Sequence, residues 1–329
     1  MRVTVLGAGS WGTTLASLVA PRHPTLLWAR SEEVAAEVRQ ERSNRAYLPG
    51  FRLPSALSAT ADLSEAAGTA DVLLVAVPTE HFREVLVSAK AAVRPWIPIV
   101  SLAKGLEQES YLRMTQVVRE VYPGHPAAAL TGPNIAREIM AGKAAAAVVA
   151  TEDLAVATEL QKLLMRGLFR VYVNHDVVGC EIGGALKNVV AIAAGIGQGL
   201  EVGDNTRAAV MSRGLAELTR LGVAMGAEQA TFAGLAGMGD LIVTCMSPYS
   251  RNRMVGERLG RGERLEEILA DMNMVAEGVR TAEVVLDLAE RHGLDLPICR
   301  AIHQVVGGKL PPSGAYFGLR PAGHEADPG

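Results

Sequence analysis

Residues 1–16 read MRVTVLGAGSWGTTLA, and this stretch decides the fold. The apolar run VTVL leads directly into Gly7, Gly9 and Gly12, so a G-x-G-x-x-G pattern lies where a buried strand would turn into a helix. In that context the first glycine permits a tight turn, the second lets the backbone approach a pyrophosphate, and the third lets the helix pack closely. The N-terminus of the helix then faces the anion. We therefore predict a strand–turn–helix unit that binds a dinucleotide.

Two other interpretations of this stretch remain open. One is a glycine-rich turn that binds no ligand. The other is a secretory signal, since few charges follow Met1 and Arg2 before Arg22. A signal is disfavoured because glycines and polar residues interrupt the apolar run that such a segment needs.

The next apolar run indicates which dinucleotide is bound. Residues 25–29 (TLLWA) are predicted to form the second strand, and Arg30 follows it. Proteins that bind NAD usually carry an acid here for the ribose 2′-hydroxyl, whereas a fixed cation suits a 2′-phosphate. Glu32 and Glu33 are expected in the first turn of a helix, where carboxylates are favourable. NADP is therefore favoured and NAD stays open, while a solvated surface charge is the alternative for Arg30.

The composition limits the possible classes of protein. A chain of 329 residues suggests two domains. Its net charge of −3 offers no polybasic surface for nucleic acid or membrane. No apolar run approaches the ~20 residues of a membrane helix. Three widely spaced cysteines fit no metal site and favour a reducing, cytoplasmic setting.

Lysine is rare in this chain, which has 26 arginines and six lysines. Arginine keeps its proton, whereas a desolvated lysine releases it. A lysine in an arginine-rich chain therefore suggests a specific role. Two of the six, Lys104 and Lys187, lie in segments that look functional on other grounds.

Short apolar runs alternate with helical patterns up to about Asn174, and only helical patterns follow. This alternation predicts an α/β domain with an open, doubly wound parallel (Rossmann-like) sheet, followed by an all-helical domain. We expect a dinucleotide-binding domain at 1–174, a substrate domain at 175–310 and a tail at 311–329. Strands are expected at 3–6, 25–29, 72–77, 97–103, 127–130, 144–150 and 169–173. Helices are expected at 79–90, 153–166, 176–198, 204–224, 228–235, 248–259, 264–271, 278–293 and 298–307.

Both rare lysines have a functional and a structural interpretation. Lys104 follows a predicted strand in SLAKGLE, at the sheet edge where such folds bind ligands; a loop cation is the alternative. Lys187 follows Gly183 and Gly184 on one face of a long helix, and each glycine weakens a helix by roughly 1 kcal/mol. Close approach of a ligand would explain the glycines. Helix packing through small residues, with Lys187 reaching outward, is the alternative.

Two further segments carry candidate polar groups. Asp240 lies in GLAGMGDLIVTC, either as a functional carboxylate or as the N-cap of a helix beginning at Leu241. In PYSRNR, Arg251 adjoins Asn252, and an arginine fork beside an amide suits a phosphate. Exposed helix polarity would produce the same letters.

Taken together, these motifs closely resemble the bacterial NAD(P)-dependent glycerol-3-phosphate dehydrogenases. The resemblance spans residues 1 to about 307. It rests on GAGSWGTTLA, SLAKGLE, TGPNIAREI, GGALKNVVAIAAGI, GMGDLIVTC, YSRNR and MVAEGVRT. It implies reduction of dihydroxyacetone phosphate to sn-glycerol 3-phosphate for glycerophospholipid synthesis, and a homodimer in the cytoplasm.

The resemblance also implies roles for individual residues. Lys187 would donate and accept the proton, surrounded by Lys104, Asn188, Asp240 and Thr244. Residues that would hold the substrate are Lys104, Gly132, Asn134, Lys187, Asp240, Ser250, Arg251 and Asn252. Residues that would contact the cofactor are Gly7, Gly9, Ser10, Trp11, Gly12, Arg30, Lys104, Ala136, Arg251, Val275 and Glu277. Family members often have serine in place of Asn134, where an amide can still hydrogen-bond. No metal is expected.

Two rival functions differ in the residues that they require. A dehydrogenase of the same fold could act on a hydroxyacid or a nucleotide sugar, and the latter would need a nucleophilic cysteine such as Cys245. A non-catalytic NADP sensor would not need Lys187, Asp240 and Arg251 together.

Overall fold

The computed structural model describes residues 1–272 and 276–319, which fall into two compact units. The sheet unit comprises residues 1–103 and 112–177, and the helical unit comprises residues 104–111 and the chain from 178 onward. The sequence predicted a single boundary between the two domains, after residue 174. The structure instead assigns 104–111 to the helical unit, because Leu106 is buried in the core of that unit.

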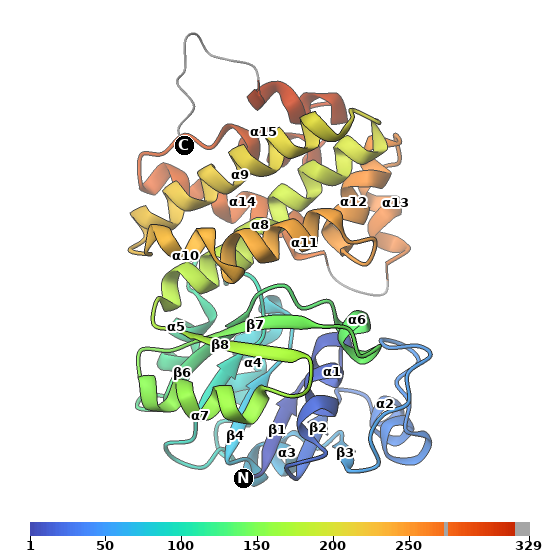
Figure 1. The fold of residues 1–329 in the computed structure, drawn as a ribbon, viewed down its shortest axis with the longest axis vertical. Helices are drawn as coiled ribbons and strands as arrows, with labels where there is room; N and C mark the ends of the chain where they lie inside the picture. Colours follow the sequence, from blue (N-terminus) through green and yellow to red (C-terminus); the bar gives the residue numbers. More distant parts are fainter. Residues whose placement is uncertain (273–275, 320–329) are drawn as a thin grey trace. The chain divides into compact units, whose positions relative to one another are not determined.

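The sheet unit alternates strands and helices, blue to green in Figure 1. Its strands are β1 (Val3–Leu6), β2 (Thr25–Trp28), β3 (Leu57–Thr60), β4 (Val72–Val75), β5 (Ile99–Ser101), β6 (Ala127–Thr131), β7 (Ala145–Ala150) and β8 (Phe169–Asn174). Its helices are α1 (Ser10–Val19), α2 (Glu32–Ala36), the π-helical turn η1 (Glu37–Glu41), α3 (Leu63–Thr69), α4 (Thr79–Ala89), α5 (Met114–Val121), α6 (Ala136–Met140) and α7 (Leu154–Leu164). The helix expected at Glu32 and Glu33 is α2, whereas the sequence analysis missed β3 and the short helices α3, α5 and α6.

The eight strands form one sheet in the order β3-β2-β1-β4-β5-β6-β7-β8. The strand order reverses beside β1, as a doubly wound sheet requires. All neighbours are parallel except β6 and β7, which pair antiparallel through Leu130 and Val149. The predicted α/β class is therefore confirmed, with one antiparallel pair that the sequence did not reveal.

Both faces of the sheet are buried, because alternate side chains of a strand point to opposite faces. Val3 and Val5 of β1 join a core with α1, α6 and α7, while Leu6 joins a second core with α3, α4 and α5. The side chains of β4 alternate between the same two cores. This two-sided burial explains why the strands are almost purely apolar.

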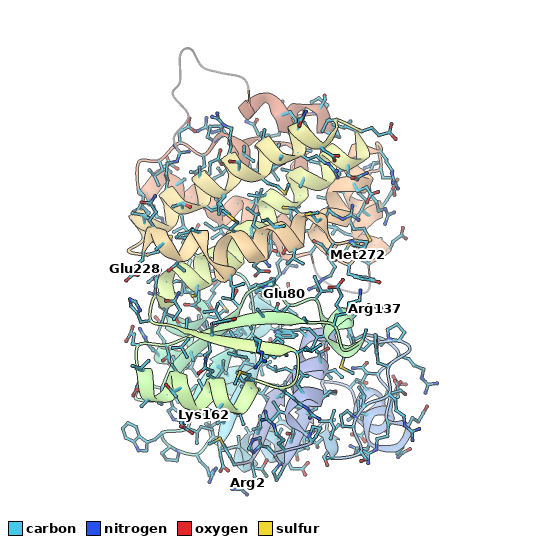
Figure 2. All side chains as sticks on the ribbon, viewed as in Figure 1. Arg2, Glu80, Arg137, Lys162, Glu228 and Met272 are labelled. Carbon is cyan, nitrogen blue, oxygen red and sulfur yellow. The ribbon has the colours of Figure 1, made fainter. Side chains whose placement is uncertain are left out.

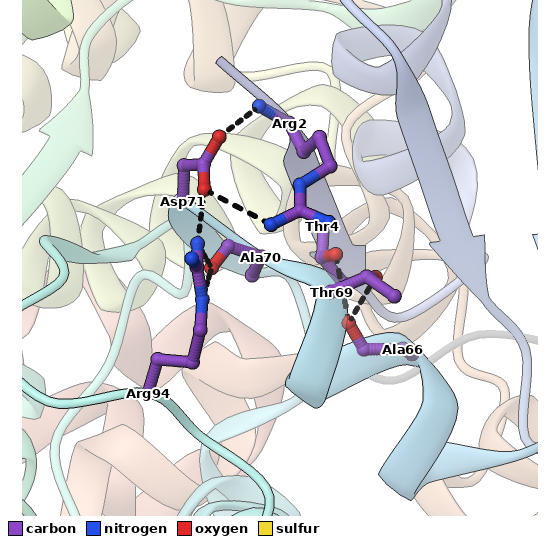
Figure 3. Close-up of polar contacts among 7 residues, drawn as sticks. All are labelled: Arg2, Thr4, Ala66, Thr69, Ala70, Asp71 and Arg94. Atoms are coloured by element: carbon purple, nitrogen blue, oxygen red, sulfur yellow. Dashed lines mark hydrogen bonds and ion pairs between the residues drawn. The ribbon is translucent and has the colours of Figure 1, made fainter.

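A polar cluster ties the start of β1 to the start of β4, as Figure 3 shows. Asp71 accepts a hydrogen bond of 2.6 Å from the backbone N–H of Arg2 and forms an ion pair with Arg94. The hydroxyl of Thr4 donates to the carbonyl of Ala66 at 2.8 Å. The hydrogen bond from Arg2, together with Arg94, lowers the pKa of Asp71.

The helical unit packs around one long helix, α8. Its helices are α8 (Val177–Gly199), α9 (Asp204–Ala224), α10 (Gln229–Ala233), the π-helical turn η2 (Leu235–Gly239), α11 (Asp240–Met246), α12 (Arg251–Gly260), α13 (Leu265–Ala270), α14 (Glu277–Arg291), α15 (Pro297–Val306) and the 3₁₀ helix η3 (Pro312–Leu319). The expected all-helical character of this region is confirmed. The predicted tail is in part structured: Ala315 in η3 is buried, and the hydroxyl of Tyr316 donates to the carbonyl of Ala193 in α8 at 2.9 Å.

α8 corrects one expectation from the sequence. Within the described ranges it is the only helix long and apolar enough to cross a membrane, although no such run was expected. Of its most apolar 18 residues, 94 % are buried inside the structure. A core helix surrounded by others has this composition because it has no polar face.

Candidate functional site

Three charged side chains meet inside the helical unit. Lys187 in α8 forms an ion pair with one carboxylate oxygen of Asp240, the first residue of α11. Lys104, from the 104–111 segment, contacts the other oxygen at 2.9 Å. The side chains of Lys187 and Asp240 are 4 % and 1 % exposed, whereas that of Lys104 is 16 % exposed. One carboxylate thus contacts the Nζ atoms of two lysines.

Two further predicted residues fix this cluster. The hydroxyl of Thr244 accepts a hydrogen bond of 2.9 Å from Lys187 Nζ and donates to the backbone carbonyl of Asp240 at 2.6 Å. The amide of Asn188 donates to the carbonyl of Lys104 at 3.2 Å. The structure therefore brings together all five residues predicted as catalytic.

Burial and neighbouring charges shift the pKa values of Lys187 and Asp240 in different ways. Burial lowers the pKa of Lys187 to about 7, opposed by Asp240 and helped by the like charge of Lys104. Burial alone would raise the pKa of Asp240, but Lys104 and Lys187 outweigh it and hold that pKa below its usual range. A lysine with a pKa near neutrality gains and loses a proton readily, so the cluster suits proton transfer.

The other lysines differ from this pair. Lys90, Lys143, Lys162 and Lys309 are all exposed. Lys162 lies on the outside of α7 in Figure 2, with its side chain 64 % exposed. The scarcity of lysine in the sequence therefore pointed to the two lysines that lie in a charged cluster.

The structure decides between the interpretations of Asp240 and of Gly183. The N-cap of α11 is Gly239, with no side-chain cap, so the N-cap interpretation of Asp240 is wrong. A Cβ on Gly183 would lie 2.8 Å from the carbonyl oxygen of Ala236, so close packing against η2 accounts for this glycine. The alternative of helix packing is thus correct for Gly183, but Lys187 points inward.

A second group of polar residues begins beside Asn188. A Cβ on Gly278 would lie 2.6 Å from the carbonyl oxygen of Asn188. The Gly278 N–H donates to Oδ1 of Asn252 at 3.0 Å. Asn252 thus joins the starts of α12 and α14, which leaves its amide N–H₂ as a donor for an anion. Glu277 is the first residue of α14.

The start of α12 presents a suitable anion-binding arrangement. Ser250 is its N-cap, and its Oγ accepts from the N–H of Arg253 at 3.3 Å. Arg253 itself is paired with Glu257 at 2.8 Å. Arg251 differs, because no residue in the described part of the chain forms a hydrogen bond or ion pair with its guanidinium. A cation without a partner at a helix N-terminus attracts anions.

In the sheet unit, the glycine-rich turn has the predicted shape. Gly7 has a φ of +111°, which favours glycine, and a Cβ on Gly12 would lie 2.0 Å from the Gly7 carbonyl oxygen. A Cβ on Gly9 would meet nothing within 4 Å. α1 begins at Ser10 with no side-chain cap and no acid in its first turn. Its first N–H groups therefore fit a pyrophosphate.

Sequence reasoning missed Asn44, which supports this turn. Its fully buried amide donates to the carbonyl of Ala8 at 2.8 Å and to the hydroxyl of Thr13 at 2.9 Å. Asn44 lies 36 residues beyond Ala8 in the chain. No sequence motif around Asn44 indicates that it contacts the glycine-rich turn. Only the fold brings it to the turn.

The remaining predicted residues occupy separate places. Trp11 in α1 packs edge-on against Phe169, with ring centroids 6.1 Å apart. Arg30 follows β2 and is exposed. Gly132, with a φ of +112°, and Asn134 lie between β6 and α6, which begins at Ala136. Val275 lies outside the described residues.

The buried thiol of Cys245 argues against one rival function. Burial raises its pKa to about 12. Because the thiolate is the nucleophile, such a thiol is inert near neutrality. A nucleotide-sugar dehydrogenase that used this cysteine is therefore disfavoured.

Comparisons with known proteins cover both units. Residues 2–157 match the family profile "NAD-dependent glycerol-3-phosphate dehydrogenase N-terminus", and residues 176–316 match the corresponding C-terminus profile. The chain is 54 % identical over 331 residues to a glycerol-3-phosphate dehydrogenase (NAD(P)+) of Sphingopyxis alaskensis, covering 100 % of this chain and 99 % of that protein. It is 53 % identical to that of Mycobacterium avium, covering 98 % of this chain and 96 % of that protein.

Solved structures show the same similarity. A crystal structure of glycerol-3-phosphate dehydrogenase from Coxiella burnetii has a TM-score of 0.92 and 35 % identity, covering 97 % of this chain and 98 % of that chain. D-Mandelate dehydrogenase has a TM-score of 0.62 at 12 % identity and shares the fold alone.

Proposed function

The chain belongs to the NAD(P)-dependent glycerol-3-phosphate dehydrogenases, and from that premise we propose that Lys187 is the proton donor of the reaction. The protein is an oxidoreductase that reduces dihydroxyacetone phosphate to glycerol 3-phosphate with NADH or NADPH. The observation that supports the role of Lys187 is its burial against Asp240, with a pKa of about 7.

The chemistry requires a proton at one atom. NAD(P)H, when bound, would supply the hydride to the carbonyl carbon, and negative charge would develop on the ketone oxygen. The Lys187 ammonium donates its proton to that oxygen, which completes the alcohol and leaves a neutral amine. Asp240 stabilises the ammonium before the transfer, and Thr244 orients it. Lys104 stabilises the developing oxyanion.

The phosphate of the substrate needs a separate anchor. We propose that Arg251, Ser250 and the amide N–H₂ of Asn252 hold it. Support comes from the guanidinium of Arg251, which has no partner within residues 1–272 and 276–319, and from its place at the start of α12. Binding energy from this remote group can be used to align the reacting carbonyl. Gly132 and Asn134 remain predicted substrate contacts.

The nucleotide is assigned to the sheet unit. The turn at Gly7, Gly9 and Gly12, followed by Ser10 and Trp11, would hold the pyrophosphate. We further propose a preference for NADPH, because Arg30 is an exposed cation at the end of β2. Contacts of the cofactor with Lys104, Ala136, Arg251, Val275 and Glu277 remain predictions, as do a homodimer, a cytoplasmic location and a role in glycerophospholipid synthesis.

Replacement of Lys187 tests the proposed proton donor. Lys187→Ala should lower turnover by about 10²- to 10⁴-fold, while NADPH binding changes little. Lys187→Arg should not restore turnover, because a guanidinium keeps its proton. Lys162→Ala is the matched control, since it removes an exposed lysine. Near-normal turnover in Lys187→Arg would show that charge alone suffices and would refute the assignment.

A further inference from the structure

Residues 104–111 form a strap that belongs to the helical unit although the sheet unit provides the chain on both sides of it. Lys104 lies at one end of this strap and contacts Asp240. Tyr111 lies at the other end. The question is which contacts keep this partly exposed segment, and with it Lys104, against a buried carboxylate.

Beyond Lys104, the strap is attached to the helical unit at Tyr111 and at Leu106. The hydroxyl of Tyr111 donates to Oδ2 of Asp287 at 2.7 Å, and the guanidinium of Arg291 lies 4.2 Å from the centre of the Tyr111 ring. Both partners are on α14. Between the ends, Leu106 is buried in the core around α8. The strap therefore has an anchor at Tyr111 and a second one in its middle.

The backbone at Tyr111 supports the view that this anchor is specific. Its φ is +60°, in the left-handed region that bulky residues rarely adopt. Such a conformation persists only where the surroundings determine it. The aromatic ring over Arg291 and the hydrogen bond to Asp287 are the contacts that do so.

We propose that Tyr111, held by Asp287 and Arg291, is a positioning residue that keeps Lys104 against Asp240. The proposal rests on the roles of Lys104 and Lys187 described above. Tyr111 acts through Lys104 and touches none of the reacting atoms. Asn188 assists from the other end by holding the carbonyl of Lys104.

This arrangement has a measurable consequence for Lys187. The like charge of Lys104 is among the causes that lower the pKa of Lys187, after burial. If the strap loosens, the ammonium of Lys104 moves towards water, and the pKa of Lys187 rises. The ionisable groups that act on Lys187 are Asp240, Lys104 and the Cys245 thiol. Those that act on Tyr111 are Asp287, Arg291 and Glu283.

The test is a direct titration of Lys187 in the ligand-free full chain. With only six lysines, four of them exposed, the protein labelled with [ε-¹³C]lysine gives few NMR signals. The signal lost in Lys187→Arg identifies Lys187. Lys104→Ala should raise the titration midpoint of Lys187 by about one pH unit. Tyr111→Phe keeps the ring and removes the hydroxyl, so it should raise the midpoint by roughly half as much.

A double variant separates positioning from general loosening. In a Lys104→Ala background, Tyr111→Phe should cause no further rise, because its target is gone. Asp287→Asn should resemble Tyr111→Phe. Tyr316→Phe is the matched control: it removes a phenol that donates to the α8 backbone, and it should leave the midpoint unchanged. In pH profiles, kcat for dihydroxyacetone phosphate should change with the midpoint, with little change in KM.

Each other outcome has a defined meaning. If Lys104→Ala leaves the midpoint of Lys187 unchanged, Lys104 does not act on the pKa of Lys187 and this inference fails, while the proposed role of Lys187 as proton donor stands. If Lys104→Ala raises the midpoint but neither Tyr111→Phe nor Asp287→Asn does, only the inference is overturned. If Tyr111→Phe still raises the midpoint in the Lys104→Ala background, Tyr111 acts by another route and the inference is again overturned.

Discussion

Replacement of Asp240 by asparagine should change the pH dependence of ketone reduction in a calculable direction. Asp240 is the only carboxylate in contact with Lys187 among the described residues, and it raises the pKa that burial lowers. The asparagine keeps the size and one acceptor oxygen. The negative charge is lost, so the Nζ atoms of buried Lys187 and partly exposed Lys104 lie near each other without a counter-charge.

The size of the effect follows from the position of Lys187. An opposite charge in contact changes a pKa by about one to three units, so without Asp240 the pKa of Lys187 should fall from about 7 by that amount. Reduction needs the protonated lysine, so activity falls as pH rises through this pKa. At pH 8, each unit of decrease lowers the protonated fraction, and with it turnover, roughly tenfold. Near pH 5 the difference from the unaltered enzyme should be smaller.

The assay is the loss of absorbance at 340 nm with saturating NADPH and dihydroxyacetone phosphate, measured between pH 5 and pH 9. Asp71→Asn is the matched control, because it removes an ion-paired carboxylate of the sheet unit. In that variant, the fall of activity with rising pH (the descending limb of the pH profile) should stay at its original pH. A limb that stays in place in Asp240→Asn would refute the idea that the limb reports Lys187. The direction also matters, since Lys104→Ala should move the limb the opposite way.

Two predictions concern the arginines. Arg251→Ala should lower kcat/KM for dihydroxyacetone phosphate by about 10- to 150-fold, the equivalent of roughly 1.5–3 kcal/mol for a charge-assisted contact. Unphosphorylated dihydroxyacetone should lose much less, and an equal loss for both ketones at saturating NADPH would show that Arg251 does not hold the phosphate. Arg30→Asp should weaken NADPH binding far more than NADH binding, through lost attraction and added repulsion at the 2′-phosphate. Equal weakening of both nucleotides, measured by titration, would contradict that assignment.

Local patterns in the sequence predicted the parts of the fold that local physics decides. The run VTVL followed by three glycines predicted β1, the turn and α1, because burial on both faces leaves a recognisable apolar strand. β3 was missed because its LSAT sequence is short and only half apolar. The antiparallel pairing of β6 with β7 depends on the path of the chain, which composition does not record.

Roles that depend on distant partners could be predicted only in part. Asp240 looked equally like an N-cap, because Lys104, its partner, lies 136 residues away. Tyr111 gave no signal, since Asp287 is 176 residues further along. Lysine scarcity, by contrast, was informative without any contact information. A lysine at position 187 can release its proton, which is a chemical requirement that arginine cannot meet.

That requirement separates the two kinds of cation proposed for the site. Arg251 would bind a phosphate whose charge persists throughout the reaction, so a group that is always protonated and presents a planar fork is suitable. Lys187 must lose its proton in one direction and regain it in the other, so its pKa has to lie near the working pH. Burial lowers the pKa of Lys187, and the negative charge of Asp240 limits that decrease. Lys104 remains partly exposed beside the same carboxylate, where its charge favours the neutral form of Lys187. Exchanging Arg251 for lysine should therefore be tolerated better than exchanging Lys187 for arginine, because only the second exchange removes a proton that must move.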